Sequence, residues 1–276
     1  MMASERAIGI DTSAGEKKKN PLHGIDQPVI ELLDVTKSFG TVKALGPINL
    51  AIANATFVSI VGPSGCGKST LLRLIGGLDR PTIGRLERYG AEIDGPSRDV
   101  SIVFQDHVLF PWASVLDNVM LPADVISLPR AQALERARWL LELTGLKDFA
   151  DHKPHMLSGG MKQRAAFCRA LLSDPQILLL DEPFGALDAL TREELSLELS
   201  RLWQSLARTA ILITHDIDEA ILLGDRLIVM SERPGAILLD MEVDLPRPRD
   251  IDTEKSQRFL EIKQMARNLI FMRRQA

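Results

Sequence analysis

The sequence has few cysteines, no long hydrophobic run and no excess of basic residues, and each absence excludes a class of protein. Two cysteines, Cys66 and Cys168, are too few for a disulfide scaffold or a cysteine-based zinc site. The longest apolar runs, such as residues 177–180, fall far short of the roughly 18 residues that cross a bilayer. Because no apolar stretch stands near the first residue, we expect no secretory signal peptide. The sequence therefore predicts a soluble intracellular protein that reaches a membrane only through a partner.

The charges of the chain are nearly balanced. Its 276 residues include 33 Lys and Arg against 37 Asp and Glu, which gives a formal net charge of −4 and a pI of about 5.8. Proteins held to nucleic acid phosphates usually carry a basic excess. Hydrophobic residues make up 45% of the chain, as in ordinary globular proteins, and the length corresponds to one or two domains. We therefore expect a globular chain without a nucleic acid partner.

Patterns of strands and helices alternate from Val29 onward. Buried strands are predicted over 29–35, 56–61, 100–104, 176–180, 209–214 and 226–230, and helices over 68–78, 116–126, 130–144, 160–172, 189–206 and 217–223. Such alternation is typical of a mainly parallel sheet covered by helices on both faces. Residues 116–173 contain helical patterns only, which predicts a helical subdomain over about 106–173 between two strands of the sheet.

The two ends of the chain depart from this alternation. Residues 1–28 contain three consecutive lysines and no apolar periodicity, and we expect them to form a disordered arm. Near the other end, Phe259, Ile262, Ala266 and Leu269 recur at the spacing of one helix face. Residues 246–276 are therefore predicted to form a C-terminal extension with an amphipathic helix that packs against the domain.

One glycine-rich segment has the spacing of a phosphate-binding loop. Residues 62–70 fit the pattern G-x-x-x-x-G-K-[ST] between a predicted strand and a predicted helix. Glycines let consecutive backbone N–H groups turn inward, and the start of the next helix adds its unpaired N–H groups and its dipole. Lys68 supplies a charge for the β- and γ-phosphates, and the Ser69 hydroxyl suits Mg²⁺. The segment predicts a nucleoside triphosphate site made of Gly62, Pro63, Ser64, Gly65, Cys66, Gly67, Lys68, Ser69 and Thr70.

Polar residues follow two of the predicted buried strands. Asp181 and Glu182 come after one apolar run, and His215 comes after another. Parallel sheets bind ligands at the carboxyl ends of their strands. Asp181 suits the binding of Mg²⁺, and Glu182 suits the orientation and deprotonation of an attacking water, with His215 beside it. The other histidines, which are expected to be structural, are His23, His107, His152 and His155.

A second loop with helix-starting character follows about 90 residues after the phosphate loop. It contains Ser158, Gly159 and Gly160, in which the serine is a natural N-cap and the glycines allow close approach of the backbone. Residues 157–160, Leu-Ser-Gly-Gly, resemble the signature motif of the ATP-binding cassette family, and the other motifs of that family occur in order over about 29–245. The resemblance implies a phosphate-loop ATPase core of α/β class, with a mainly parallel sheet, an antiparallel β edge and an inserted helical subdomain.

The resemblance also implies roles for further residues. Gln105 resembles the Q-loop glutamine, which contacts Mg²⁺ and the attacking water, and Asp188 resembles the D-loop aspartate. Phe39 stands where the family has an aromatic residue that stacks on adenine; a core aromatic at a strand end is the alternative. In the family, the signature of one subunit closes on the γ-phosphate held by the other. The implied assembly is a homodimer that holds two ATP molecules between its subunits.

Three less specific segments point to one branch of the family. The apolar residues of 108–112 lie where the family forms a groove for a coupling helix of the membrane subunit; burial inside the subdomain is the alternative for some of them. Residues 109–112 (Leu-Phe-Pro-Trp), 232–235 (Glu-Arg-Pro-Gly) and 245–249 (Leu-Pro-Arg-Pro-Arg) resemble segments of the nitrate, sulfonate and taurine importer group.

The implied function is that of the ATP-hydrolysing subunit of an importer for nitrate, a sulfonate, taurine or a related small solute. Its implied partners are a second copy of itself, two transmembrane permease subunits and, indirectly, a periplasmic solute-binding protein. The implied location is peripheral, on the cytoplasmic side of the inner membrane. A lipid-trafficking cassette and a soluble cassette ATPase outside transport are the alternatives.

Overall fold

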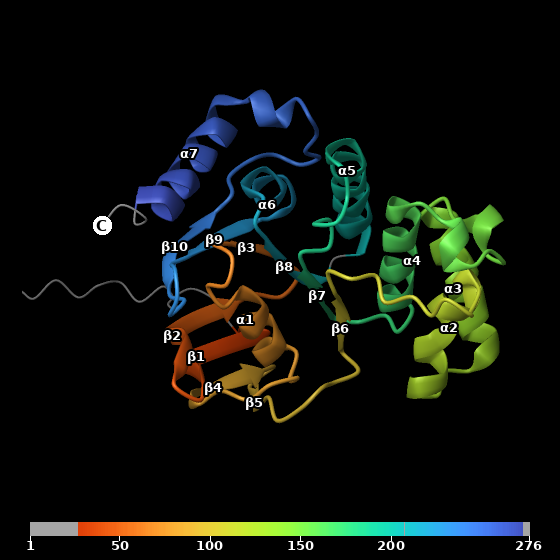
Figure 1. Cartoon of the computed structure of the whole chain (residues 1–276), viewed down its shortest axis with the longest axis horizontal. Helices are drawn as coiled ribbons and strands as arrows, with labels where there is room; N and C mark the ends of the chain where they lie inside the picture. The colour runs from red at the N-terminus through yellow and green to blue at the C-terminus, as the bar shows by residue number, and fades with distance from the viewer. Residues whose placement is uncertain (1–26, 207, 273–276) are drawn as a thin grey trace, which may run out of the picture.

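The computed structural model describes residues 27–206 and 208–272, and within them the strands form two sheets (Figure 1). Nearly all of the arm predicted over 1–28 lies outside the described residues. The larger sheet has the order β10-β9-β3-β8-β7-β6 and is parallel except for β10. The smaller sheet has the order β2-β1-β4-β5 and is antiparallel. The predicted α/β class, with a mainly parallel sheet and an antiparallel edge, is confirmed.

Along the described residues, single helices or groups of helices separate single strands or runs of strands. The strands are β1 (Ile30–Phe39), β2 (Val42–Ile52), β3 (Phe57–Val61), β4 (Ile83–Arg88), β5 (Ala91–Glu92), β6 (Val100–Val103), β7 (Ile177–Asp181), β8 (Thr209–Thr214), β9 (Arg226–Met230) and β10 (Ile237–Glu242). The α-helices are α1 (Lys68–Ile75), α2 (Val115–Ile126), α3 (Arg130–Leu143), α4 (Gly159–Leu171), α5 (Ala189–Leu206), α6 (Ile217–Leu223) and α7 (Gln257–Met272), and short 3₁₀ turns occur at Lys147–Phe149, Pro154–Met156 and Thr253–Lys255.

Helix α1 ends before the predicted position. The sequence predicts a helix that reaches residue 78, but α1 stops at Ile75, and Gly76 and Gly77 follow. Gly77 has φ of +70°, and a Cβ there would lie 2.2 Å from the backbone oxygen of Gly95. A side chain at this position would therefore clash with the backbone, and the left-handed conformation turns the chain away from the helix axis.

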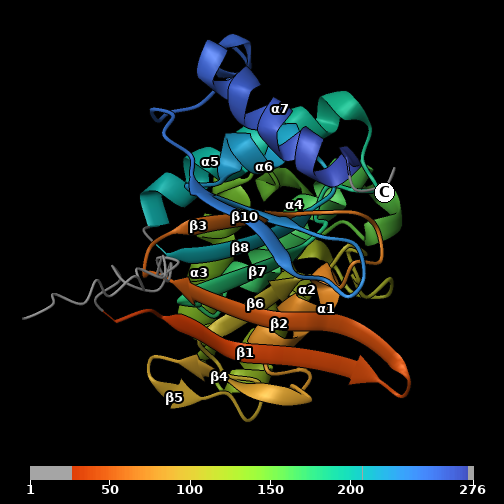
Figure 2. The ribbon, with the colours of Figure 1, turned by 90° about the vertical axis from the view of Figure 1, so that its left-hand side faces the viewer.

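Helices cover both faces of the larger sheet (Figures 1 and 2). On one face, α1 and the smaller sheet enclose a core that includes Ile60, Leu71 and Ile211. On the other face, α6 and α7 pack on β9 and β10, and the helices α2–α5 share a further core with β7 and β8. Phe259, Ile262 and Ala266 of α7 are buried there, and Leu269 packs against them. The predicted packing of the C-terminal helix is therefore confirmed.

The parallel strands bring several loops to one edge of the larger sheet. Val61 at the end of β3 pairs with Thr214 at the end of β8, and Asp181 at the end of β7 pairs with Ile213. The loops that follow β3, β7 and β8 therefore begin side by side. The structure thus gathers the phosphate loop, the carboxylates and His215 at the edge where the sequence predicted them.

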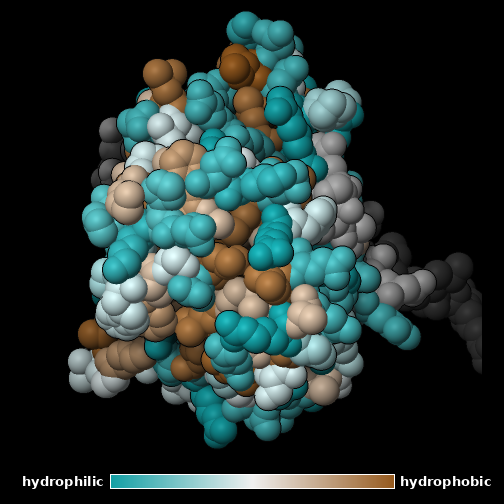
Figure 3. Space-filling model, turned by 90° about the vertical axis from the view of Figure 1, so that its right-hand side faces the viewer, coloured by the Kyte–Doolittle hydropathy of each residue, from teal (hydrophilic) through white to brown (hydrophobic). Residues whose placement is uncertain are grey.

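The helices α2, α3 and α4 lie between β6 and β7 in the chain and beside the sheets in space (Figure 1). Ser114 begins α2 with a capping box: its side chain accepts from the N–H of Asp117, whose carboxylate accepts from the N–H of Ser114. Apolar side chains are visible between polar ones on the face of the molecule that these helices form (Figure 3). Among the described residues, no helix is long and apolar enough to cross a membrane.

The segment 245–249 closes the end of α6. The guanidinium of Arg249 is buried and donates to the carbonyl oxygens of Gly224 (2.6 Å) and Ile221 (2.8 Å), among others. Arg247 donates to the carbonyl of Leu223 (2.6 Å) and to the carboxylate of Asp225. The last carbonyls of a helix have no partner within it, so these two arginines cap α6.

Candidate functional site

The phosphate loop connects β3 to α1, as the sequence predicted. Gly67 precedes α1 with φ of +109°, and a Cβ there would lie 2.7 Å from Cδ2 of Leu45 and 2.9 Å from the carbonyl oxygen of Ala44. Gly65 has φ of +75°. Both backbone conformations favour glycine, and at Gly67 the packing against β2 also excludes a side chain. The glycine spacing of the motif therefore has a direct structural cause.

Lys68 is buried within this loop. Its Nζ donates to the carbonyl oxygen of Gly62 (2.8 Å) and to that of Pro63 (3.1 Å). The ammonium group is thus held against the loop's own backbone at the first residue of α1. The neighbouring thiol of Cys66 is buried as well, and burial raises its pKa.

Ser69 and Asp181 meet although 112 residues separate them in the sequence. The hydroxyl of Ser69 donates to Oδ1 of Asp181 at 2.9 Å. Burial raises the pKa of the Asp181 carboxyl, the hydrogen bond from Ser69 opposes that rise, and the charge of Glu182 adds to it. A hydroxyl of the phosphate loop and a carboxylate of β7 thus form one cluster of oxygen atoms.

Glu182 stands beside His215 at the same edge. Its Oε2 lies 3.1 Å from Nδ1 of His215, and its own N–H donates to the carbonyl of Ile213. Glu182 has φ of +45°, a conformation that a residue with a side chain adopts at a cost of order 1–3 kcal/mol. A Cβ added to Gly185 would lie 3.5 Å from Nε2 of Gln105 and 3.6 Å from Oε2 of Glu182. The structure therefore brings the side chains of Glu182 and His215 together, and Gly185 lies close to both Gln105 and Glu182.

The remaining predicted residues lie on separate elements. Phe39 ends β1 with half of its surface exposed and Nζ of Lys37 at 4.9 Å from its ring centroid, so the alternative of a core aromatic is excluded. Oδ1 of Asp188 accepts from the N–H of Thr191 at the start of α5. Among the described residues, no hydrogen bond joins the segment 158–160 to the phosphate loop of the same chain.

The signature segment forms the start of α4. Ser158 is its N-cap, and its hydroxyl accepts from the N–H of Met161 at 3.3 Å, as predicted. The glycines also serve packing: a Cβ on Gly160 would lie 2.8 Å from Cγ2 of Thr191. A side chain at position 160 would therefore press against α5 of the same chain. The sequence had suggested only that the glycine leaves room for a bound anion.

The sequence did not indicate three contacts of the site. Arg192 donates to the carbonyl of Leu187 (3.2 Å) and to Asp216 (3.3 Å), and so joins the segment before α5 to the segment after His215. Nδ1 of His107 lies 2.5 Å from Oε1 of Gln163, so this histidine ties the segment after Gln105 to α4.

The third such contact involves Arg233, which donates to Gly65 in the phosphate loop. The sequence contained one signal for Arg192, its position one helical turn after Asp188.

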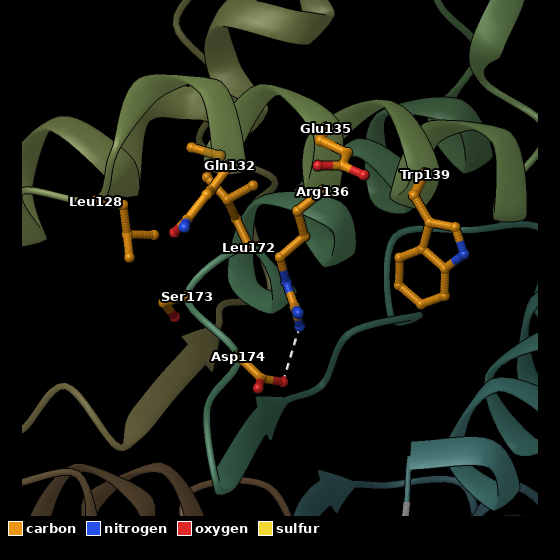
Figure 4. Close-up of a pocket in the computed structure, with 9 residues that line it drawn as sticks. Leu128, Gln132, Glu135, Arg136, Trp139, Leu172, Ser173 and Asp174 are labelled. Atoms are coloured by element: carbon orange, nitrogen blue, oxygen red, sulfur yellow. Dashed lines mark hydrogen bonds and ion pairs between the residues drawn. The ribbon is translucent and has the colours of Figure 1, made fainter.

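A cavity of about 570 Å³ lies apart from these residues, between α3 and the segment that follows α4 (Figure 4). Leu128, Trp139 and the ion pair of Arg136 with Asp174 (2.8 Å) are among its walls. No residue predicted for the nucleotide site lines it. Figure 4 shows the side chains of Leu128, Arg136, Trp139 and Asp174 around this cavity.

A phosphate loop after the central strand, with a carboxylate pair at the end of a neighbouring parallel strand, defines a phosphate-loop nucleoside triphosphatase. Comparison with known families extends this assignment, because residues 45–185 match the ABC transporter family. The chain belongs to that family.

Several relatives match most of the chain. An uncharacterized ABC transporter ATP-binding protein of Methanocaldococcus jannaschii is 43% identical over 245 residues, which cover 87% of this chain and 91% of that protein. The aliphatic sulfonates import ATP-binding protein SsuB 1 of Agrobacterium fabrum is 45% identical over 240 residues, which cover 87% of this chain and 83% of that protein.

Among solved structures, the dimeric structure of the bacterial ABC transporter cassette MJ0796 is similar to this chain with a TM-score of 0.68 and 36% identity. The match covers 78% of this chain and 98% of that one. Membership of the family makes this chain an ATP-binding subunit with ATPase activity that is coupled to transport.

Proposed function

We propose that the chain is the ATP-hydrolysing subunit of an importer for a small solute such as an aliphatic sulfonate, nitrate or taurine. In this proposal two copies hold two ATP molecules between them and dock on two permease subunits at the cytoplasmic side of the membrane. A periplasmic solute-binding protein delivers the solute to the permeases. The observation that carries the hydrolytic part of the proposal is the meeting of Glu182 and His215 (3.1 Å) beside the Ser69–Asp181 pair (2.9 Å). The similarity to an aliphatic sulfonates import ATP-binding protein supports the solute class.

ATP is bound by the phosphate loop, residues 62–70. The unpaired N–H groups at the start of α1 face an anion favourably, and the ammonium of Lys68 adds a full charge. In the structure that ammonium bonds to two backbone carbonyls, which a phosphate oxygen can replace as its acceptors. Phe39 offers a half-exposed ring for stacking on adenine. A second solved structure of the MJ0796 cassette, in a post-hydrolysis state, is bound to ADP and Pi, which supports the same class of ligand here.

The oxygen cluster of Ser69 and Asp181 fits Mg²⁺. Hydroxyl and carboxylate oxygens are the ligands that this ion takes, and it completes its shell with water and substrate phosphates. Among the described residues, no group of three or more His, Cys, Asp or Glu side chains is placed to hold a metal by itself, so a site completed by ATP agrees with this ligand set. Ser69 and Asp181 would hold the ion, with Gln105 nearby, and the ion would neutralise phosphate charge.

Glu182 is the proposed general base. Its carboxylate, held at the sheet edge by the bond from its N–H to Ile213, can orient and deprotonate the attacking water. His215 is proposed to orient the Glu182 carboxylate and to contact the γ-phosphate, and Gln105 to position the water. Because phosphoryl transfer needs positioning and charge stabilisation, these residues form no covalent intermediate.

Each chain is proposed to carry two separate halves of a site. The start of α4, with Ser158, Gly159 and Gly160, presents backbone N–H groups. Among the described residues, these groups make no hydrogen bond to the phosphate loop of the same chain. In a dimer these groups close on the γ-phosphate held by the second copy, with Asp188 at the same interface. The dimeric MJ0796 cassette supports this arrangement by similarity.

The stretch 108–112 is the proposed docking surface for the permeases. Val108 and Trp112 are exposed, and the Trp112 ring is stacked on Phe110 with centroids 4.9 Å apart. Leu109 instead packs against the helical core, so the alternative of burial holds for that residue. Arg169 of α4 donates to the carbonyls of His107 and Val108, so this stretch is tied to the signature helix. Closure of the dimer can therefore move the docking surface.

Replacement of the lysine tests the proposed ATP site. Lys68→Ala should weaken ATP binding by roughly ten- to a hundredfold, since a hydrogen bond to a charged group contributes about 1.5–3 kcal/mol. Lys43→Ala, which removes an exposed lysine outside the loop, should leave the ATP dissociation constant unchanged. Titration calorimetry measures both. Equal ATP affinity in the wild-type chain and Lys68→Ala would overturn the proposal.

A further inference from the structure

The turn between β9 and β10 carries residues 232–235, which the proposed function does not use. The turn is closed on itself: the N–H of Ser231 donates to the carbonyl of Ala236 (2.8 Å), and the N–H of Ala236 donates to Oγ of Ser231 (2.9 Å). Ser231 Oγ in turn donates to the carbonyl of Glu232 at 2.8 Å. Arg233 lies between the residues that these hydrogen bonds join, so the bonds hold its backbone in a defined place.

The same turn is joined to β2, which packs against the phosphate loop. The N–H of Gly235 donates to the carbonyl of Ala44 (3.0 Å), and the carbonyl of Gly235 accepts from Gly46 (2.8 Å). A Cβ on Gly235 would lie 2.2 Å from the carbonyl oxygen of Cys66. Glycine is therefore required at 235 because the backbone of the turn lies directly against the backbone of the phosphate loop.

Arg233 makes the polar contact of the turn with that loop. Its Nε and Nη2 both donate to the carbonyl oxygen of Gly65, at 3.1 and 2.9 Å. The N–H at the other end of the same peptide unit, that of Cys66, donates to the carbonyl of Pro63 at 3.3 Å. The Gly65–Cys66 peptide is therefore fixed at both ends, and a rotation of this peptide would break both contacts. Gly65, which has no side chain and φ of +75°, would otherwise allow such a rotation at little cost.

We propose that Arg233 is a positioning residue of the nucleotide site, which holds the Gly65–Cys66 peptide so that the phosphate loop keeps the shape that receives a triphosphate. This inference rests on the proposed ATP site. Arg233 acts through the loop backbone and supplies two hydrogen bonds from one planar group. Lysine has the same charge but a single nitrogen, so it cannot reproduce both donors with their geometry. Residues 232–235, which resemble a segment of one branch of the family, thus gain a physical role through Arg233.

The test compares Arg233→Lys and Arg233→Gln with the wild-type chain and with Arg85→Gln, which removes an exposed arginine that pairs with Glu87. Both Arg233 variants should bind ATP roughly three- to tenfold more weakly, because a partly solvated charged hydrogen bond has that order of effect. Their KM for ATP should rise by the same factor, with kcat at saturating ATP within about twofold of the wild type, as for a loss of uniform binding. Arg85→Gln should match the wild type in both.

The outcomes separate the inference from the proposed function. If the wild-type chain binds ATP and both Arg233 variants bind it equally well, the inference is wrong and the ATP site stands. If Arg233→Lys equals the wild type and only Arg233→Gln is weakened, charge alone acts and the proposed two-donor contact is wrong. A fall in kcat at unchanged KM would also contradict it. If the wild-type chain binds no ATP, the proposed function fails first. Thermal unfolding of each variant checks that it is folded, and Arg233→Lys keeps the test valid if Arg233→Gln does not fold.

Discussion

Oε2 of Glu182 lies 3.1 Å from Nδ1 of His215, although the two residues follow different strands of the sheet. The pair leads to the first prediction. Glu182→Gln keeps the size of the side chain and removes its ability to take a proton, so the rate of ATP hydrolysis should fall by about a hundredfold or more. ATP affinity should stay unchanged, and a nucleotide-bound dimer should accumulate. Phosphate release and gel filtration with ATP measure these effects, and substantial residual hydrolysis would contradict the role of Glu182.

The buried carboxyl of Glu219 predicts a dependence of stability on pH. Burial raises its pKa to about 8 from the ordinary 4.5, Asp216 adds to the rise, and the bond from Thr214 opposes it. Between these values the folded chain binds more protons at this group than the unfolded chain. The contribution of Glu219 to stability is therefore fully present below pH 4.5 and is lost as the pH rises toward 8.

Glu219→Gln should remove this dependence, because glutamine is neutral at every pH in the range. The free energy of unfolding of the wild-type chain should fall with a slope of up to about 1.4 kcal/mol per pH unit relative to the variant. Urea unfolding of both chains at several pH values measures the difference. Parallel pH profiles for the two chains would show that Glu219 is not protonated in the folded state.

Arg249 should contribute to stability through the end of α6. Arg249→Met keeps an apolar stem but leaves the buried carbonyls of Ile221 and Gly224 without these donors, and each unsatisfied group costs about 1–3 kcal/mol. We expect a loss of at least about 2 kcal/mol in the free energy of unfolding. Arg85→Met, at an exposed site, should change it by less than about 0.5 kcal/mol. Equal denaturant midpoints for the two variants would refute the capping role.

Trp112 tests the proposed docking surface. Its side chain is 71% exposed, and burial of an aromatic ring in a partner is a common source of binding energy. Trp112→Ala should reduce capture of the permease subunits in a pull-down at least about tenfold. ATP binding should not change.

Trp139 offers a matched control on α3, because it is also exposed but lines the cavity of Figure 4. Trp139→Ala should leave the capture of the permeases unchanged. If Trp139→Ala impairs capture and Trp112→Ala does not, the docking surface lies at the cavity instead.

The sequence predicted the elements that consist of continuous apolar runs. The bounds of β8 and β9 agree residue by residue with prediction, because a strand buried on both faces leaves an uninterrupted pattern. The predicted bounds of α5 and α6 also agree with the structure. The strands β2, β4, β5 and β10 were not predicted. In β4 and β10 most residues are partly or fully exposed, so neither strand has a buried run.

The site was predictable where its residues follow local motifs, and its long-range contacts were not. Ser158 as an N-cap depends on the next three residues only. The contact of Arg233 with Gly65 spans 168 residues and depends on how the β9–β10 turn meets β2, which no local pattern encodes. For the same reason the contact of His107 with Gln163 emerged only from the fold.

The central claim is that each ATP site combines the phosphate loop of one copy with the signature segment of the other. Lys68→Ala damages the first half, and Ser158→Asp damages the second half by placing a carboxylate near the γ-phosphate while keeping an N-cap. Each variant alone should be nearly inactive. A mixed dimer contains one doubly damaged site and one intact site.

The most direct measurement is therefore the ATPase rate of an equal mixture of the two variants, with mixed dimers verified by co-purification of two different tags. Random pairing makes half of the dimers mixed, so the rate should recover to as much as about a quarter of the wild-type value. A mixture that forms mixed dimers and stays as inactive as its components would contradict the claim.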